Sequence, residues 1–277
     1  MFQIFVTIFV ALSATMIGSE ATNVYRLRID KTIDIKEAPF VAAIMLNNRY
    51  HCNSAIVSPQ FILSTAGCIL MIKDQLQNVK IRTGTNNLRK GGHTSAVEAY
   101  FLNDVTRYDI EETKLYTIGA LKLKTPIPFG VTQKPIQIGR LPQDLYESNP
   151  PQFITPLLKK WRTPVYGWGQ NWRGDENSLG FRKIEGAVIL RDAHCQRFVK
   201  NAGIGYLNHH ICSYVRSGYL GNDSSLLVYD NKLVGLASFF DIEVIDERNR
   251  KSYASVLTNV DKVKKFIIDL IGEQNFA

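Results

Sequence analysis

The sequence predicts an all-β protein with one clear helix, at its C-terminal end. Short apolar runs separated by turn residues recur from Phe40 to Phe240, with few helical stripes between them. Short strands spaced in this way are typical of a β-sandwich or of a pair of β-barrels. The runs lie at residues 40–46, 54–58, 61–66, 79–84, 117–123, 164–169, 185–190 and 233–239.

The predicted helix covers about residues 260–271 and follows Thr258-Asn259. Its apolar residues recur at helical spacing and fall on one face, whereas Lys262 and Lys265 lie off that face. Gly272 is expected to end the helix. The apolar positions are Val260, Val263, Phe266, Ile267, Leu270 and Ile271.

A β-hairpin is predicted from Leu227 to Gly235. Two apolar pairs, Leu227-Val228 and Leu233-Val234, flank the turn residues Tyr229-Asp230-Asn231-Lys232. Asp and Asn tolerate the left-handed backbone conformation that a tight hairpin turn requires. The Asp-Asn pair is therefore expected at the tip of the hairpin.

The first residues, 1–21, are typical of a secretory signal peptide. An apolar run from Ile4 to Leu12 is too short to span a bilayer, and small residues follow it up to Ala21. No later stretch approaches the roughly 20 apolar residues of a transmembrane helix. The mature chain, 22–277, is therefore expected outside the cell and without a transmembrane segment.

The four cysteines of this chain predict two disulfides, because a secreted chain of this size meets oxidising conditions. Spacing alone allows three connectivities, of which local pairing is the simplest. Local pairing joins Cys52 to Cys68 and Cys195 to Cys212. No metal is predicted, because no cysteine pair has the short spacing that zinc sites use, and no cofactor is predicted either.

A net charge of +8 makes the protein basic, with lysines at Lys262, Lys264 and Lys265 among the local concentrations. Basic surfaces attract acidic glycans, anionic membranes and acidic partners through a salt-sensitive field. A solvated surface that aids solubility is the simpler interpretation. Nucleic acid is not an expected partner of a secreted protein.

Several motifs, in order along the chain, resemble those of the trypsin-like serine proteases. The loop from Gly221 to Val228 resembles the family pattern GDSGGPLV, and residues 165–170 resemble its Gly-Trp-Gly strand. Residues 51–68 resemble the loop in which a Cys-Gly-Gly-Ser strand leads to Thr-Ala-Ala-His-Cys. Residues 116–127 and 256–260 resemble two further strands of the family.

This resemblance implies two antiparallel six-stranded β-barrels with a C-terminal α-helix. The first barrel is expected at about 27–139 and the second at about 154–260. It also implies the same local disulfides. The chain also resembles the insect-type secreted protease homologues that lack a clip domain.

The departures from the family pattern lie at the catalytic positions. Gly67, Thr117 and Asp223 occupy the positions of the catalytic histidine, aspartate and serine. The serine attacks, the histidine takes its proton and the aspartate holds the histidine in place. Loss of the serine or histidine alone costs on the order of 10⁶ in turnover. The resemblance therefore implies a protein without protease activity.

The activation and substrate-binding positions are altered as well. Cleavage after Arg26 would create a new amino terminus at Leu27, but the aspartate that normally pairs with that terminus is replaced by Asn222. Ser217 takes the place of an acid at the base of the substrate pocket. Ser238 keeps the serine of the family's Ser-Trp-Gly strand, and Phe240 takes the place of its glycine. Phe240 is expected to intrude on the pocket entrance.

Asn222 also begins the N-glycosylation sequon Asn222-Asp223-Ser224. A glycan there would lie in the former active-site cleft, and its attachment requires the loop to be exposed during synthesis.

The expected function is protein binding, as a cofactor, decoy or regulator in an extracellular protease cascade of an immune or reproductive fluid. The fold keeps a cleft and variable loops but lacks the groups that turn over a ligand. The expected partner is an extracellular protein, such as an active protease or its substrate. Two alternatives are an active serine endopeptidase with a rearranged site and a protein that binds acidic glycans or the cell surface.

Overall fold

The computed structural model of the chain describes residues 30–103, 118–142, 163–169, 180–189, 195–196, 210–215, 224–238, 242–245 and 251–273. The predicted signal peptide lies outside these ranges. Within them, no helix combines the length and the apolar character needed to cross a membrane.

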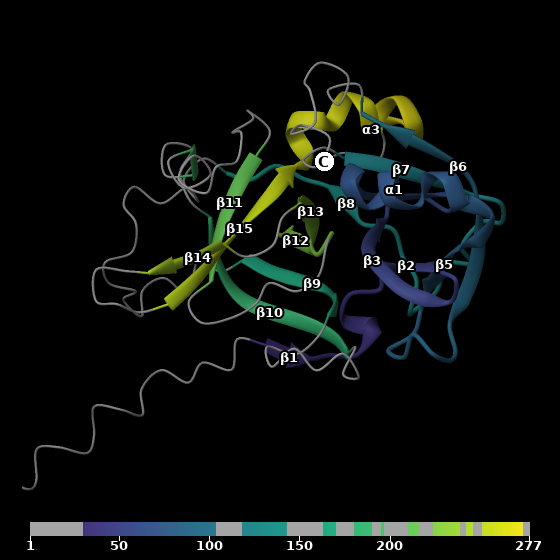
Figure 1. Cartoon of the computed structure of the whole chain (residues 1–277), viewed down its shortest axis with the longest axis horizontal. Coiled ribbons are helices and arrows are strands. Elements are labelled where there is room, and N and C mark those ends of the chain that lie inside the picture. Colours follow the sequence, from purple (N-terminus) through teal and green to yellow (C-terminus); the bar gives the residue numbers. More distant parts are fainter. Residues whose placement is uncertain are drawn as a thin grey trace, which may run out of the picture.

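The first barrel is closed by six antiparallel strands in the order β2-β3-β4-β7-β6-β5 (Figure 1). Each run predicted at residues 40–46, 54–58, 61–66, 79–84 and 117–123 overlaps one of these strands. The strands are β2 (Val41–Leu46), β3 (Arg49–Ile56), β4 (Phe61–Thr65), β5 (Val79–Thr83), β6 (His93–Leu102) and β7 (Ile118–Leu123).

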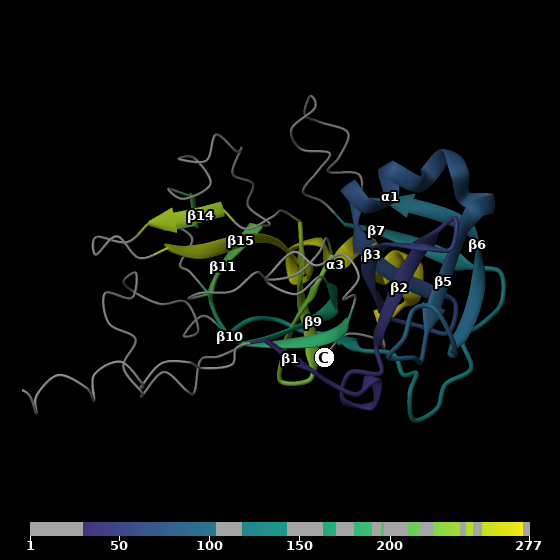
Figure 2. The same ribbon diagram turned by 60° about the horizontal axis from the view of Figure 1, so that its bottom comes forward.

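A second six-stranded barrel follows from the pairing of the remaining long strands. Strand β9 pairs with β10 and β12, β10 with β11, β11 with β15, β15 with β13, and β13 with β12, which closes the ring. The two barrels lie side by side in Figures 1 and 2. The strands of the second barrel are β9 (Thr163–Gly169), β10 (Gly180–Ile189), β11 (His210–Val215), β12 (Leu226–Tyr229), β13 (Lys232–Ala237) and β15 (Lys251–Asn259). The predicted pair of antiparallel six-stranded barrels is confirmed.

Three short strands extend the second barrel. Strand β1 (Asp30–Thr32) pairs antiparallel with β10, β8 (Gln137–Ile138) pairs parallel with β13, and β14 (Ile242–Ile245) pairs antiparallel with β15. Strands β1 and β8 fall inside the range expected for the first barrel, yet both bond to the second. The chain therefore crosses between the barrels near both ends of that range.

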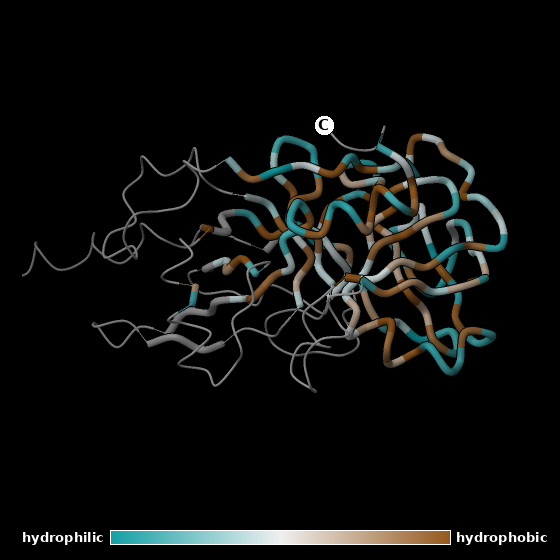
Figure 3. The backbone as a smooth tube through the Cα atoms, turned by 90° about the horizontal axis from the view of Figure 1, so that it is seen from above, coloured by the Kyte–Doolittle hydropathy of each residue, from teal (hydrophilic) through white to brown (hydrophobic). Residues whose placement is uncertain are grey.

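Hydrophobic and hydrophilic stretches alternate along the backbone in Figure 3. Strands β2, β4 and β7 are buried along nearly their whole length, whereas β5 alternates between buried and more exposed residues. In β5, Val79, Ile81 and Thr83 are buried while Lys80 is exposed, as expected of a strand with one face on the core. Strand β6 was not among the predicted runs, because polar residues such as His93, Thr94 and Glu98 interrupt its apolar positions. Tertiary pairing with β5 and β7 makes it a strand.

The predicted hairpin is present. Strands β12 and β13 are joined by Asp230 and Asn231, whose φ angles are 49° and 58°. Two consecutive residues with positive φ give the turn geometry that matches the twist of a two-residue hairpin. Asp and Asn supply this conformation at low cost.

The predicted C-terminal helix is also confirmed, although its first turn is tighter than an α-helix. It consists of the 3₁₀ segment η7 (Val260–Val263) followed by α3 (Lys264–Ile271), and Gly272 ends it with φ 83°. Val260, Val263, Ile267 and Ile271 are buried. This apolar face packs into the main core cluster, which also contains residues of the first barrel.

Some helical segments of the described residues were not predicted from the sequence. They are α1 (Ala66–Ile72), with a buried face of Ala66, Cys68, Ile69 and Ile72, and the 3₁₀ helices η1 (Ile35–Glu37) and η2 (Lys73–Asn78). Each is too short to show a helical period above the surrounding apolar runs.

Candidate functional site

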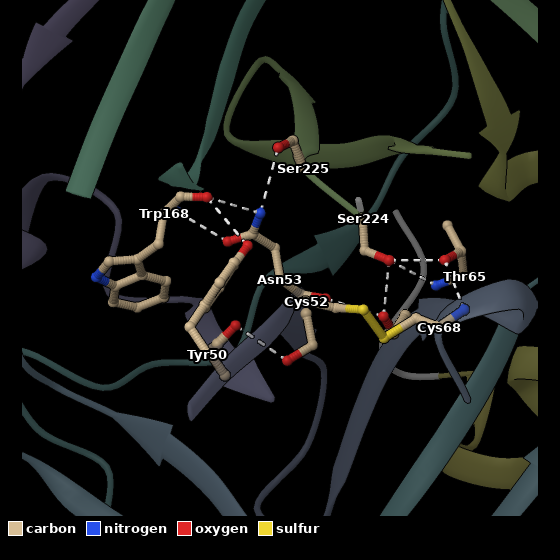
Figure 4. Close-up of a disulfide and its surroundings, with 11 residues drawn as sticks. Tyr50, Cys52, Asn53, Thr65, Cys68, Trp168, Ser224 and Ser225 are labelled. Atoms are coloured by element: carbon tan, nitrogen blue, oxygen red, sulfur yellow. Dashed lines mark hydrogen bonds between the residues drawn. A yellow bond between two sulfur atoms is a disulfide. The ribbon is translucent and has the colours of Figure 1, made fainter. Parts of the chain in front are cut away.

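The candidate site lies where the two barrels meet, around the disulfide between Cys52 and Cys68 (Figure 4). Strand β3 and the start of α1 reach this junction from the first barrel. The segment that begins at Ser224 and enters β12 reaches it from the second barrel. These segments contain two positions of the family pattern. Gly67 stands at the position of the histidine, and Ser224 stands at the position after the serine.

Gly67 lies in the first turn of α1 and is partly buried. The helix begins there because the Thr65 side chain accepts a hydrogen bond from the Cys68 backbone N–H, the usual N-cap contact. The backbone is therefore that of a regular helix start, but glycine carries no imidazole. Nothing at this position can take a proton from a nucleophile.

Ser224 is fully buried, and its hydroxyl is bonded to the first barrel. Ser64 Oγ donates to Ser224 Oγ at 2.8 Å and the Thr65 N–H donates at 3.1 Å, while Thr65 Oγ1 lies 2.8 Å away. A hydroxyl has one donor and two acceptor sites, so these contacts use its full capacity. Its partners among the described residues are two hydroxyls and an amide, none of which is a general base.

The Ser224 backbone has φ 64°, a left-handed conformation that glycine adopts more readily than serine. In the family pattern this position is a glycine, so the conformation agrees with the predicted ungapped placement of the loop. The hydrogen bonds of the side chain offset the conformational cost.

Asn53 makes a second contact between the barrels, to the left of Ser224 in Figure 4. Its Oδ1 accepts from the Trp168 N–H at 2.7 Å, and its Nδ2 donates to the Trp168 carbonyl at 3.2 Å and to Ser225 Oγ at 3.3 Å. Tyr50 also donates its hydroxyl to the Trp168 carbonyl, at 3.0 Å. Asn53 and Ser225 are both buried. A single amide thus joins β3 to β9 and to the start of β12.

Of the predicted pocket residues, Ser238 is described. Its hydroxyl lies 2.7 Å from Thr258 Oγ1, and its N–H donates to the Val256 carbonyl at 2.9 Å. The side chain therefore bonds to the adjacent strand β15. The other predicted positions lie outside the described residues: Thr117, Ser217, Asn222, Asp223 and Phe240.

Both predicted disulfides are present, Cys52–Cys68 and Cys195–Cys212. His51 lies beside the first disulfide, with a ring nitrogen within 4.8 Å of both sulfurs. The two sulfurs are bonded to each other, so they are not thiolate ligands for a metal. Burial lowers the pKa of His51, so its imidazole is neutral at neutral pH.

Asn53 was not among the residues predicted to form the site. A signal was present: residues 52–55 read Cys-Asn-Ser-Ala where the family pattern has Cys-Gly-Gly-Ser, and Ser224-Ser225 replace a second pair of glycines. Side chains gained at both places suggest that they meet in the fold. Only the tertiary structure shows which of these side chains meet.

The family model and the relatives that match this chain agree on one family. A family model for trypsin matches residues 30–267. Hypodermin-A of Hypoderma lineatum is 24% identical over 241 residues, which cover 84% of this chain and 83% of that protein. Trypsin iota of Drosophila melanogaster is 26% identical over 207 residues, covering 74% of each chain.

Solved structures with the same fold include two inactivated protease paralogues of the scabies mite. S-D1 has a TM-score of 0.66 at 20% identity and covers 88% of this chain and 97% of its own. S-I1 has a TM-score of 0.65 at 20% identity, with 87% and 99% covered. Neuropsin, a serine protease of mouse brain, has a TM-score of 0.63 at 16% identity, with 87% and 97% covered. At these identities the likeness establishes the fold.

Proposed function

Because this chain belongs to the trypsin family, we propose that it is a secreted, catalytically inactive member that acts by binding another extracellular protein. The expected partner is an active protease or its substrate, for which the chain serves as a cofactor, decoy or regulator. The observation that carries the proposal is the burial and hydrogen bonding of Ser224 and Ser225. These serines follow the nucleophile position, and both are buried and bonded within the fold.

The rearranged-enzyme alternative requires a serine hydroxyl that a substrate can reach and a base within hydrogen-bond distance. Ser224 and Ser225 are 0% and 1% exposed. The Ser224 hydroxyl is hydrogen-bonded to the hydroxyls of Ser64 and Thr65, and the Ser225 hydroxyl accepts a hydrogen bond from Asn53. Gly67 supplies no imidazole on the opposite side. These contacts favour loss of catalysis over a relocated nucleophile.

Loss of catalysis is tested with a serine-reactive fluorophosphonate and a panel of peptide substrates, before and after limited trypsin treatment. We expect no labelling and no turnover above buffer, because Gly67 carries no imidazole and the hydroxyls of Ser224 and Ser225 are buried. Active trypsin under the same conditions is the positive control. Stoichiometric labelling of a single serine, above all Ser224 or Ser225, would contradict the proposal.

Binding is tested separately. The purified chain, immobilised in its folded form, is used to capture proteins from the fluid into which it is secreted, with a heat-unfolded sample as the control. A purified candidate must then bind the folded chain in solution with a measured Kd and change the turnover of an active protease. A candidate retained equally by the unfolded chain counts against specific binding.

Binding to acidic glycans is a second candidate, favoured by the exposed Lys262, Lys264 and Lys265 on η7 and α3. Arg140, 70% exposed, adds a further positive charge beside this helix, 3.7 Å from Asp261. We expect retention on heparin at low salt that is lost at moderate salt, and earlier elution of the variant with all three lysines changed to glutamine. Equal elution of the variant and the unmodified chain would remove this candidate.

A further inference from the structure

Two groups of buried hydrogen bonds join the barrels at the candidate site. One connects Asn53 of β3 with the Trp168 backbone and Ser225. The other connects Ser224 with Ser64 and Thr65, at the end of β4 and the start of α1. The interbarrel bridge is defined here as the side chains of Asn53, Ser64, Thr65, Ser224 and Ser225 with the Trp168 backbone.

The bridge is anchored on both sides. On the second barrel, the Ser224 N–H donates to the Ala237 carbonyl at 2.8 Å, and the Ala237 N–H donates to the Ser225 carbonyl at 2.9 Å. Strand β13 therefore holds the backbone of the two serines while the first barrel holds their side chains. Residues 159 to 172 apart in sequence are joined in this way.

The space for Asn53 depends on Gly167. A Cβ placed on Gly167 would lie 2.8 Å from Asn53 Nδ2 and 2.9 Å from its Cγ, closer than side chains approach. The Asn53 amide therefore packs directly on the β9 backbone. The amide occupies the space that a side chain at position 167 would need, and its Oδ1 accepts a hydrogen bond from the N–H of the next residue, Trp168.

The family pattern has glycine where this chain has Asn53, Ser224 and Ser225, so these side chains are additions at the junction. In that pattern the loop is completed only when a new amino terminus pairs with an aspartate, whose place is taken here by Asn222. Every contact of the bridge comes from residues 53 to 225 of the continuous chain. None requires a cut after Arg26.

We propose that the interbarrel bridge takes the place of activation cleavage for the segment that begins at Ser224. It fixes this segment against the first barrel in the uncleaved chain, so that the segment has its final conformation as soon as the chain folds. Buried polar groups that are fully satisfied specify a unique arrangement, because any displacement leaves them without partners in a dry environment. This inference does not depend on which partner the protein binds.

Amide hydrogen exchange tests the proposal at two backbone groups that donate to the bridge, Thr65 N–H and Trp168 N–H. The full chain is made as the Arg26→Gln variant, which trypsin-like enzymes do not cut at that bond. We expect both amides to exchange only with global unfolding, at the rate of core amides such as that of Leu121. Exchange of either amide at the rate of an exposed loop would overturn the proposal.

Two substitutions in the same background separate the bridge from simple burial. Ser224→Gly is expected to speed exchange of the Thr65 amide at least tenfold relative to Leu121, and Asn53→Gly to do the same for Trp168. Both place glycine where the family pattern has it, which favours folding. The matched control is Ser54→Ala, a buried serine of β3 whose hydroxyl bonds to Ala42 within the first barrel.

The control should leave both relative rates unchanged. An unchanged relative rate in Ser224→Gly or in Asn53→Gly would show that the bridge does not hold the segment. If a glycine variant fails to fold, the exchange rates of the Arg26→Gln chain alone still decide the matter.

Discussion

Replacing Asn53 by alanine is expected to lower the free energy of unfolding by about 3 kcal/mol, one of the largest effects of any single substitution in this chain. The change removes the acceptor of the Trp168 N–H and the donor to Ser225, both at buried positions. A buried donor left without a partner costs about 1–3 kcal/mol, and the small cavity adds to this. The Trp168 carbonyl keeps its bond from Tyr50, which limits the loss.

Urea unfolding followed by tryptophan fluorescence measures this effect, because Trp168 is fully buried next to the substituted residue. The matched control is Gln77→Ala, which truncates an exposed amide side chain in η2 and should change the free energy by less than about 0.5 kcal/mol. A value for Asn53→Ala within the range of the control would mean that the amide contributes nothing to the junction.

Removing the disulfide between Cys52 and Cys68 in the double alanine variant is expected to cost roughly 3 kcal/mol. The bond links β3 to α1 across a sequence separation of 16 residues, and without it the unfolded chain gains the entropy of an open loop. Both cysteines are buried. Asn53 of the interbarrel bridge follows Cys52 in the sequence, and Thr65 of the bridge accepts a hydrogen bond from the Cys68 N–H. The loss should therefore also loosen the junction between the barrels.

The comparison variant is the double alanine replacement of Cys195 and Cys212. It removes a disulfide that closes a loop of nearly the same length, with a sequence separation of 17 residues. Thermal or urea unfolding should show a similar loss for both variants if loop entropy dominates. A loss below about 1 kcal/mol for the Cys52–Cys68 variant would contradict the loop-entropy account. The unmodified chain, unfolded without reductant, should show no free thiol, because every cysteine is bonded.

Much of the fold could be predicted from local pattern. The runs around Val41, Ile62 and Val165 became strands because alternating or continuous apolar residues must be buried on one or both faces. The Asp230-Asn231 turn and the Gly272 helix end follow from residues that tolerate positive φ. These features depend on neighbours in sequence, so the sequence is enough to place them.

Other elements could not be placed in this way. Strand β6 has too many polar residues to be recognised alone, and α1 is too short to show a period. Strands β1 and β8 are only three and two residues long, and their partners lie in the second barrel. Strand β1 pairs with residues 182–184 of β10, and β8 pairs with residues 232–233 of β13. These stretches lie beyond the pairing of β10 with β11 and of β13 with β15, which no local pattern reveals.

For the candidate site, the sequence by itself determined what is missing. It places Gly67 at the histidine position and Asp223 at the nucleophile position, and it shows serines where the family has glycines. The tertiary structure decided what those serines do. Ser224 bonds to Thr65 and Ser225 to Asn53 across 159 and 172 residues of sequence. A polar side chain at a buried junction must find a partner, and only the packing of one barrel on the other determines which partner is within reach.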